Sequence, residues 1–302
     1  MFSILVHIGY HKTGTTWLQN LFFSQHPSLE MGFNHREVFD YIVAPNSLDF
    51  SVDKARGYFM PKLESIASSG KIPVLSSEML CGSPFTGGRE SKENADRIAK
   101  LFPSAKILIV IREQVSAICS TYKQYVQTGG PGSLHQFLFP PFPSFSIPRF
   151  DPIHFQYHRL IKYYISLFGL SNVKVMLYES FSAEKEAFCN EILSFVGLTT
   201  SSVQHYSNKR IYASLSDRAI SIKRVLNRFS RTRTYAWPIV DIPYLHRLAI
   251  KLLGGFDSVV SSKSPQNQIY KQVKRYCQGQ FMESNRVLES LLEVDLKDFG
   301  YE

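Results

Sequence analysis

The residues with the clearest chemical meaning lie near the N-terminus, where positions 9–17 read Gly-Tyr-His-Lys-Thr-Gly-Thr-Thr-Trp and follow a mostly apolar run at positions 4–8. Gly9 and Gly14 have no Cβ, so the backbone there can turn sharply and point successive N–H groups inward at an anion. A helix that begins near Thr15 adds unpaired first-turn donors and the positive end of its dipole. The segment therefore predicts a strand, a phosphate-binding loop and a helix, in that order.

The position of the lysine separates this loop from the loops that bind ATP or GTP. Those loops place Lys-Ser or Lys-Thr directly after the last glycine. Here Thr15 follows Gly14, and Lys12 lies two residues before that glycine. The loop is therefore predicted to bind the phosphate of a different nucleotide.

A second set of phosphate-binding residues follows a later apolar run, Lys106–Ile111. Arg112 comes directly after this run and Ser120 lies eight positions further on, within a predicted helix. A guanidinium offers a planar fork for a phosphate dianion, and a hydroxyl can complete the set of donors. The carboxyl end of a parallel strand is also where doubly wound folds bind ligands.

Together these motifs resemble the sulfotransferases, which use 3′-phosphoadenosine 5′-phosphosulfate (PAPS) as sulfuryl donor. Their 5′-phosphosulfate loop shows a lysine, a small residue, glycine, Thr-Thr and often Trp, as this chain does at 12–17. In that family an arginine at this strand end and a serine eight residues later bind the 3′-phosphate of the donor, as Arg112 and Ser120 would here. The family usually has proline near Gln114, a departure that leaves the phosphate contacts unaffected. The resemblance thus implies a donor site formed by Lys12, Thr13, Gly14, Thr15, Thr16, Trp17, Arg112 and Ser120.

Tyr178, Lys209 and Arg210 are further candidates for the donor site. Residues 175–179, Val-Met-Leu-Tyr-Glu, resemble the family's strand that ends in Tyr-Glu near the donor. The stretch 209–233 holds eight lysines and arginines against one acid. It is either a solvated helix face or a wall that holds the 3′-phosphate or an anionic acceptor.

Sulfuryl transfer needs a cation for the leaving phosphate and a base for the acceptor. Lys12 and the backbone donors beside it are placed to stabilise the charge that grows on the 5′-phosphate. Glu78 ends an apolar run, and in glycan-type sulfotransferases a glutamate just after the second strand is the base. His11 and His35 are the alternative bases. No cluster of residues with metal-ligand spacing is evident, so we expect no metal ion.

The elements that must position these residues alternate between strand-like and helix-like patterns. This alternation predicts an α/β fold with a P-loop-like parallel sheet flanked by helices, in one domain spanning 1–302. A proline-rich loop at about 129–150 and an insertion or lid at about 231–268 interrupt it. Strands are predicted at 4–8, 72–75, 107–111 and 173–178, and helices at 17–22, 95–102, 155–168 and 183–196.

Composition narrows the class of protein. The chain has 302 residues, 44% of them hydrophobic, and a net charge of +9. Its four cysteines are scattered, which argues against a disulfide framework or zinc site and favours the cytoplasm. No apolar stretch has the length of a membrane span, and the apolar N-terminal run is predicted to be a strand rather than a signal peptide.

The sequence leaves the acceptor and two other functions open. The family resemblance implies sulfation of a hydroxyl or amino group on a carbohydrate or glycosylated metabolite, with no nucleic-acid partner. A P-loop kinase or other NTPase is the first alternative, and a non-catalytic polyanion-binding protein is the second. The oligomeric state is not predicted.

Overall fold

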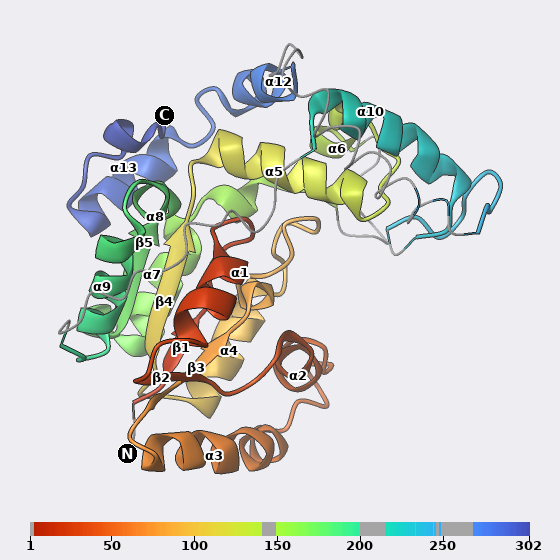
Figure 1. Ribbon diagram of the computed structural model, residues 1–302. Coiled ribbons are helices and arrows are strands. Elements are labelled where there is room, and N and C mark those ends of the chain that lie inside the picture. The colour runs from red at the N-terminus through yellow and green to blue at the C-terminus, as the bar shows by residue number, and fades with distance from the viewer. Residues whose placement is uncertain are drawn as a thin grey trace.

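A parallel sheet forms the centre of the computed structural model, which describes residues 3–140, 149–199, 215–232, 234–243, 245, 248 and 268–302. The strand order is β2-β3-β1-β4-β5, and every neighbouring pair is parallel (Figure 1). The strands are β1 (Leu5–His7), β2 (Leu29–Met31), β3 (Ile72–Ser76), β4 (Lys106–Ile111) and β5 (Val173–Leu177). The predicted α/β class with a parallel sheet is therefore confirmed.

The middle position of β1 in the sheet indicates where a ligand would bind. Leu5 is paired with Val74 of β3 on one side and with Lys106 of β4 on the other. The chain moves from β1 to β2 and β3 on one side and then crosses to β4 on the other, so the strand order reverses at β1. Ligands bind outside the carboxyl ends of strands at such a reversal. The loop after β1 begins at this point.

Each face of the sheet has its own apolar core, because side chains alternate between the two faces along a strand. Val6, Ile107 and Ile109 belong to one core, which also takes residues from α3 (Val52–Ser68), α4 (Ser91–Leu101), α5 (Gln114–Gln127) and α7 (His158–Phe168). Leu5 and Leu108 belong to the other core, together with residues of α9 and of the helix after β1. The strands are buried on both faces, as expected for a parallel sheet.

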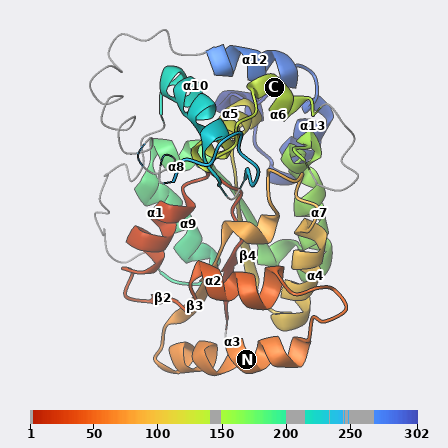
Figure 2. The same ribbon diagram turned by 90° about the vertical axis from the view of Figure 1, so that its right-hand side faces the viewer.

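Helices surround the sheet (Figures 1 and 2). The α-helices in the described part of the chain are α1 (Thr15–Trp17), α2 (His35–Val38), α3 (Val52–Ser68), α4 (Ser91–Leu101), α5 (Gln114–Gln127), α6 (Leu134–Leu138), α7 (His158–Phe168), α8 (Tyr178–Ala183), α9 (Lys185–Phe195), α10 (Asp217–Leu226), α12 (Gln268–Cys277) and α13 (Met282–Leu292). π-Helical turns span Leu18–Phe23 and Phe39–Val43. The 3₁₀ turns are Glu78–Cys81, Pro152–Phe155, Leu170–Asn172, Asn227–Phe229 and Leu296–Phe299.

The four predicted strands and four predicted helices are present, with boundaries shifted by a few residues. Tyr178 is the first residue of α8 rather than the last of β5. The sequence patterns did not predict β2, which is three residues long, or α3, whose apolar repeat is interrupted by Gly57 and Pro61. Pro61 has no N–H to donate to the carbonyl of Gly57, but both residues are exposed, so water can replace the lost hydrogen bond.

The two predicted irregular segments are partly described. The segment 129–150 is not a loop throughout, because α6 forms within it, with Ser133 and Gln136 making a reciprocal capping box at its start. In the described part of the insertion, Thr232 Oγ1 donates to Gly129 O at 3.2 Å, so this segment packs on the end of α5. Residues 141–148 and most of 244–267 lie outside the described residues.

Candidate active site

The loop after β1 makes a tight left-handed turn. Lys12 has φ 69° and Gly14 has φ 83°, the left-handed region in which glycine is favoured. A Cβ on Gly14 would lie 2.9 Å from the Phe181 ring, so this position has no room for a larger residue. The Thr13 hydroxyl donates a hydrogen bond to Tyr10 O and ties the turn together. The predicted phosphate loop thus has a fixed backbone that leads directly into α1.

Thr15 gives a direct indication that this loop fits an anion. The residue is 6% exposed, and its Oγ1 has no hydrogen-bond partner in the described part of the structure. A buried hydroxyl without a partner costs free energy. An anion oxygen held by the loop would satisfy it. Thr16, the next residue, is half-buried.

Arg112 brings the second predicted motif against the first. Its Nη1 donates to Lys12 O at 3.1 Å, across one hundred residues of sequence. Its guanidinium carbon lies 4.6 Å from the centroid of the Tyr178 ring, a cation–π contact. Tyr157 donates from its hydroxyl to Arg112 O at 2.7 Å and fixes the backbone at the end of β4. Three residues predicted from separate motifs, Lys12, Arg112 and Tyr178, are therefore neighbours.

Ser120 lies on α5, six residues after the helix begins and so about 9 Å along its axis. The helix is capped by the Glu113 carboxylate, which accepts hydrogen bonds from Val115 N at 2.6 Å and Ser116 N at 2.8 Å. Ser120 is half-buried, shares a helix face with Ser116, and forms no hydrogen bond to another described residue. Its hydroxyl is therefore available to a ligand.

The other residues of, or next to, the predicted donor-binding site do not join the contact between Lys12 and Arg112. Gln114, which replaces the family's usual proline, donates to Asn285 Oδ1 at 2.6 Å and so joins α5 to α13. Trp17 is 5% exposed and packs edge-on against Phe181, with the ring centroids 5.1 Å apart. Its predicted role in stacking on the adenine stays a prediction. Lys209 and Arg210 lie outside the described residues.

The three candidate bases lie at the neighbouring ends of β1 and β3 and at the start of α2. Glu78 is the second residue after the end of β3 and is half-buried. His11 Nδ1 lies 3.7 Å from Cys81 Sγ, whose thiol donates to Glu78 O at 3.0 Å. His35 is exposed, and its Nδ1 is 3.0 Å from Ser77 Oγ. The structure therefore brings Glu78 and His11 together beside Lys12.

The electrostatics of the site follow from partial burial and from the mixture of charges. Burial lowers the pKa of His11 to about 4, an effect that the nearby Glu78 opposes and Lys12 reinforces. The imidazole is then neutral at neutral pH. Desolvation and the neighbouring Arg112 lower the pKa of Lys12, while Glu78 raises it. An anion bound between Lys12 and Arg112 would relieve the repulsion between these two cations.

A buried network of polar side chains packs next to the loop. The sequence patterns did not predict it. His7 is fully buried at the end of β1, with its Nδ1 2.8 Å from Ser76 Oγ. Gln19 Nε2 donates to Ser76 O and to Ser76 Oγ, each at 3.1 Å. A Cβ on Gly9 would lie 2.4 Å from His7 Nε2, which explains the first glycine of the motif by packing.

The His7 network predicts a pH dependence of stability. Burial lowers the pKa of His7 from 6.5 to about 3. Between these values the unfolded chain binds a proton that the folded chain does not. The contribution of His7 to the free energy of unfolding is therefore complete above pH 6.5 and is lost as the pH falls toward 3. When the pH is lowered from 7 to 5.5, the free energy of unfolding should fall in the wild type by about 1 kcal/mol more than in His7→Gln, as measured by urea titration. Equal losses in the two proteins would mean that His7 takes up no extra proton on unfolding.

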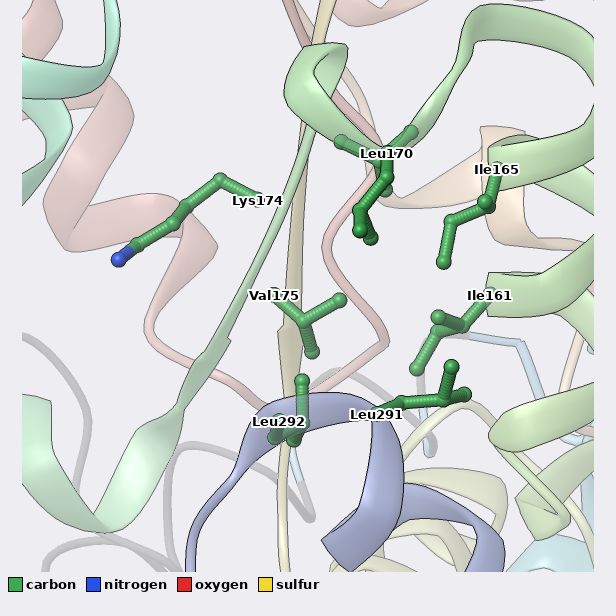
Figure 3. Close-up of a pocket in the computed structure, with 8 residues that line it drawn as sticks. Ile161, Ile165, Leu170, Lys174, Val175, Leu291 and Leu292 are labelled. Carbon is green, nitrogen blue, oxygen red and sulfur yellow. The ribbon is translucent and has the colours of Figure 1, made fainter.

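A separate pocket of about 180 Å³ has none of these residues in its lining (Figure 3). It is lined by Val173 and Val175 of the edge strand β5 together with side chains of α7 and α13. Lys174 points away from it and pairs with Glu191 at 2.9 Å. Among the described residues, no three His, Cys, Asp or Glu side chains are grouped so that they could hold a metal ion.

The part of the chain that contains β4, α5 and β5 is similar to a known protein family. Residues 90–202 match the model of the Sulfotransferase family. This segment is similar to the sulfotransferases. It contains Arg112, Ser120 and Tyr178, so the resemblance stated from the sequence is confirmed. Comparison with curated proteins gave no significant match.

Matches to solved structures extend beyond this segment. A sulfotransferase from Alicyclobacillus acidocaldarius superposes with a TM-score of 0.57 at 17% identity, covering 99% of each chain. The sulfotransferase domain from the curacin biosynthetic pathway gives 0.43 at 9% identity, over 92% of this chain and 98% of that one. The sulfotransferase domain of the Synechococcus PCC 7002 olefin synthase gives 0.38 at 11% identity, over 91% and 94%. The first of these shares the fold of this chain.

Proposed function

We propose that this chain transfers a sulfuryl group from PAPS to a hydroxyl or amino group of an acceptor. The contact between Arg112 and Lys12 supports the proposal most strongly, since Arg112 Nη1 donates to Lys12 O at 3.1 Å. A cation suited to the 5′-phosphosulfate and a cation suited to the 3′-phosphate are then adjacent. ATP has no 3′-phosphate for Arg112 to bind.

In the proposed reaction the acceptor oxygen or nitrogen attacks sulfur, and the bond from sulfur to the 5′-phosphate oxygen breaks. Negative charge grows on that phosphate, where Lys12 and the N–H groups at the start of α1 would stabilise it. Arg112 and Ser120 would hold the 3′-phosphate, and Tyr178 would orient the Arg112 guanidinium. Glu78 would take the acceptor's proton. The products are the sulfated acceptor and adenosine 3′,5′-bisphosphate.

The acceptor class and the location are part of the same proposal. A carbohydrate or glycosylated metabolite is proposed by family analogy, and no contact in the site singles it out. All four cysteines are buried as free thiols, which supports a reducing compartment such as the cytoplasm. The large core, which runs from Ile4 to Tyr301, supports a single domain.

Calorimetry with adenosine 3′,5′-bisphosphate beside ATP tests the proposal. The bisphosphate should bind more tightly than ATP. Arg112→Ala should weaken its binding about 30- to 150-fold, because charge-assisted hydrogen bonds contribute about 2–3 kcal/mol. Arg112→Lys should give an intermediate loss, since it keeps the charge but loses the fork. Arg286→Ala, whose side chain is 69% exposed on α13, is the matched control and should leave affinity unchanged.

The alternatives give different results in the same titrations. ATP binding as tight as bisphosphate binding, or unchanged affinity in Arg112→Ala, would favour a kinase or NTPase and reject the proposal. A non-catalytic polyanion-binding protein would show no preference between the nucleotides. It would instead bind heparin with a steep dependence on salt.

A further inference from the structure

Six exposed apolar side chains belong to α10 and to the segment after it, and the helix α10 lies at the upper right of Figure 1. We call this group the α10 surface, and its members are Ile222, Val225, Trp237, Ile239, Val240 and Ile242. Trp237 is 83% exposed and Ile239 is 68% exposed. Isolated apolar side chains on a surface are ordinary, but six exposed ones on one helix and the segment after it suggest an interaction site.

The backbone beneath the α10 surface is held firmly against α5. Asp217 forms an ion pair with Lys123 at 3.0 Å, and Asn227 Nδ2 donates to Val126 O at 2.7 Å and to Gly130 O at 2.9 Å. The segment after α10 folds back on the helix end, since Ile239 N donates to Arg228 O and Ile242 N to Phe229 O, both at 2.9 Å. An anchored backbone therefore presents these side chains to solvent.

Positive charge borders the apolar side chains. Arg218, Ile222 and Val225 follow one another at four- and three-residue spacing and lie on one exposed face of α10. Arg228 and Arg231 are exposed at the end of that helix and just after it. The two acids of the described part of this region are already engaged, Asp217 with Lys123 and Asp241 with Arg231. Exposed arginines and exposed apolar side chains therefore share α10 and the residues just after it.

We propose that the α10 surface docks the protein on a membrane whose headgroups are anionic. Aliphatic side chains and a tryptophan flanked by arginines suit the boundary between headgroups and acyl chains, where apolar burial and attraction to acidic lipids act together. An acidic soluble polymer would use the arginines but leave the aliphatic side chains in water. None of the helices in the described ranges has the length and hydropathy of a membrane span, so the docking is peripheral. This property goes beyond the proposed transfer reaction and does not depend on it.

The two tryptophans of the chain provide the measurement. Trp17 is 5% exposed and Trp237 is 83% exposed, so a change in fluorescence on adding vesicles reports on Trp237. Vesicles of phosphatidylcholine with 30% phosphatidylglycerol should shift the emission to the blue and sediment the protein. Vesicles of phosphatidylcholine alone should do so far less. The Trp17→Phe variant should keep the whole shift.

Variants separate the apolar contribution from the charged one. Ile239→Ser with Val240→Ser should reduce vesicle affinity at least tenfold, and Arg218→Gln with Arg228→Gln should reduce it by about thirtyfold at low salt. Leu48→Ser and Arg36→Gln are the matched controls, because Leu48 is 96% exposed and the Arg36 side chain is 80% exposed, both in segments distant from α10 in the chain. Circular dichroism should be unchanged in all four, and bisphosphate titration should be unchanged in the two controls and in the Ile239→Ser, Val240→Ser variant.

Three results would overturn the proposal. Absence of binding to the anionic vesicles is the first. The second is a heparin complex that displaces the vesicles without any shift of Trp237 emission, which would assign the arginines to a soluble polyanion. The third is a shift of tryptophan emission that depends on protein concentration in samples without vesicles, with a dimer seen in sedimentation. This result would assign the α10 surface to binding a second copy of the chain.

Discussion

Replacing Lys12 with methionine is expected to lower kcat for sulfuryl transfer by about 10²–10³-fold, while the affinity for adenosine 3′,5′-bisphosphate falls much less. The ammonium would act on charge that develops as the bond to sulfur breaks, so its removal costs more in the transition state than in the bound ground state. Methionine has nearly the same length and the same unbranched Cβ. The residue should therefore tolerate the φ of 69° about as well as lysine does.

Two comparisons show whether the charge of Lys12 is responsible. Lys54→Met, at an exposed position near the start of α3, removes a cation elsewhere and should leave kcat unchanged. Lys12→Arg keeps the charge in a longer side chain and should recover part of the rate. Single-turnover measurements with labelled donor separate the chemical step from product release. A Lys12→Met variant with full kcat would remove Lys12 from the transition state.

The parts of this site that the sequence predicted depend on local signals. The loop at 9–17 carries its glycines, lysine and threonines within nine residues, and Arg112 follows an apolar run of strand length. The parallel sheet then brings the two together without further information, because the carboxyl ends of β1 and β4 lie at the same edge. The two sequence motifs and the rule that parallel strands end at one edge were therefore sufficient to predict that Lys12 and Arg112 lie at the same edge of the sheet.

The parts that the sequence did not predict depend on distant partners. His7 is a polar residue in an apolar run, and only the pairing of β1 with β3 brings it to Ser76. Tyr157 looks like any aromatic residue before a helix, yet its hydroxyl holds the backbone of Arg112. Gln114 departs from the family motif for a reason found in α13, where Asn285 accepts its hydrogen bond. Such contacts carry no signal in a single sequence.

Glu78→Gln is expected to lower kcat by about 10²–10⁴-fold, the usual contribution of a positioned base, with bisphosphate affinity kept. The amide has almost the same shape as the carboxylate but cannot take a proton from the acceptor. The Ser77 hydroxyl, which accepts a hydrogen bond from Met79 N at 3.3 Å, caps the turn that carries Glu78 and should preserve its backbone. Glu64→Gln, at an exposed position of α3, is the control and should be fully active.

His11 is the competing base, and its surroundings make the distinction measurable. The Cys81 thiol donates to Glu78 O, so its sulfur can accept from His11 Nδ1–H and leave Nε2 free to take a proton. With a pKa near 4, His11 stays neutral and able to accept throughout the neutral range. If Glu78 is the base, His11→Gln should keep most of kcat while Glu78→Gln loses it. The opposite pattern would transfer the role to His11 and leave Glu78 as the carboxylate that opposes the lowering of the Lys12 pKa.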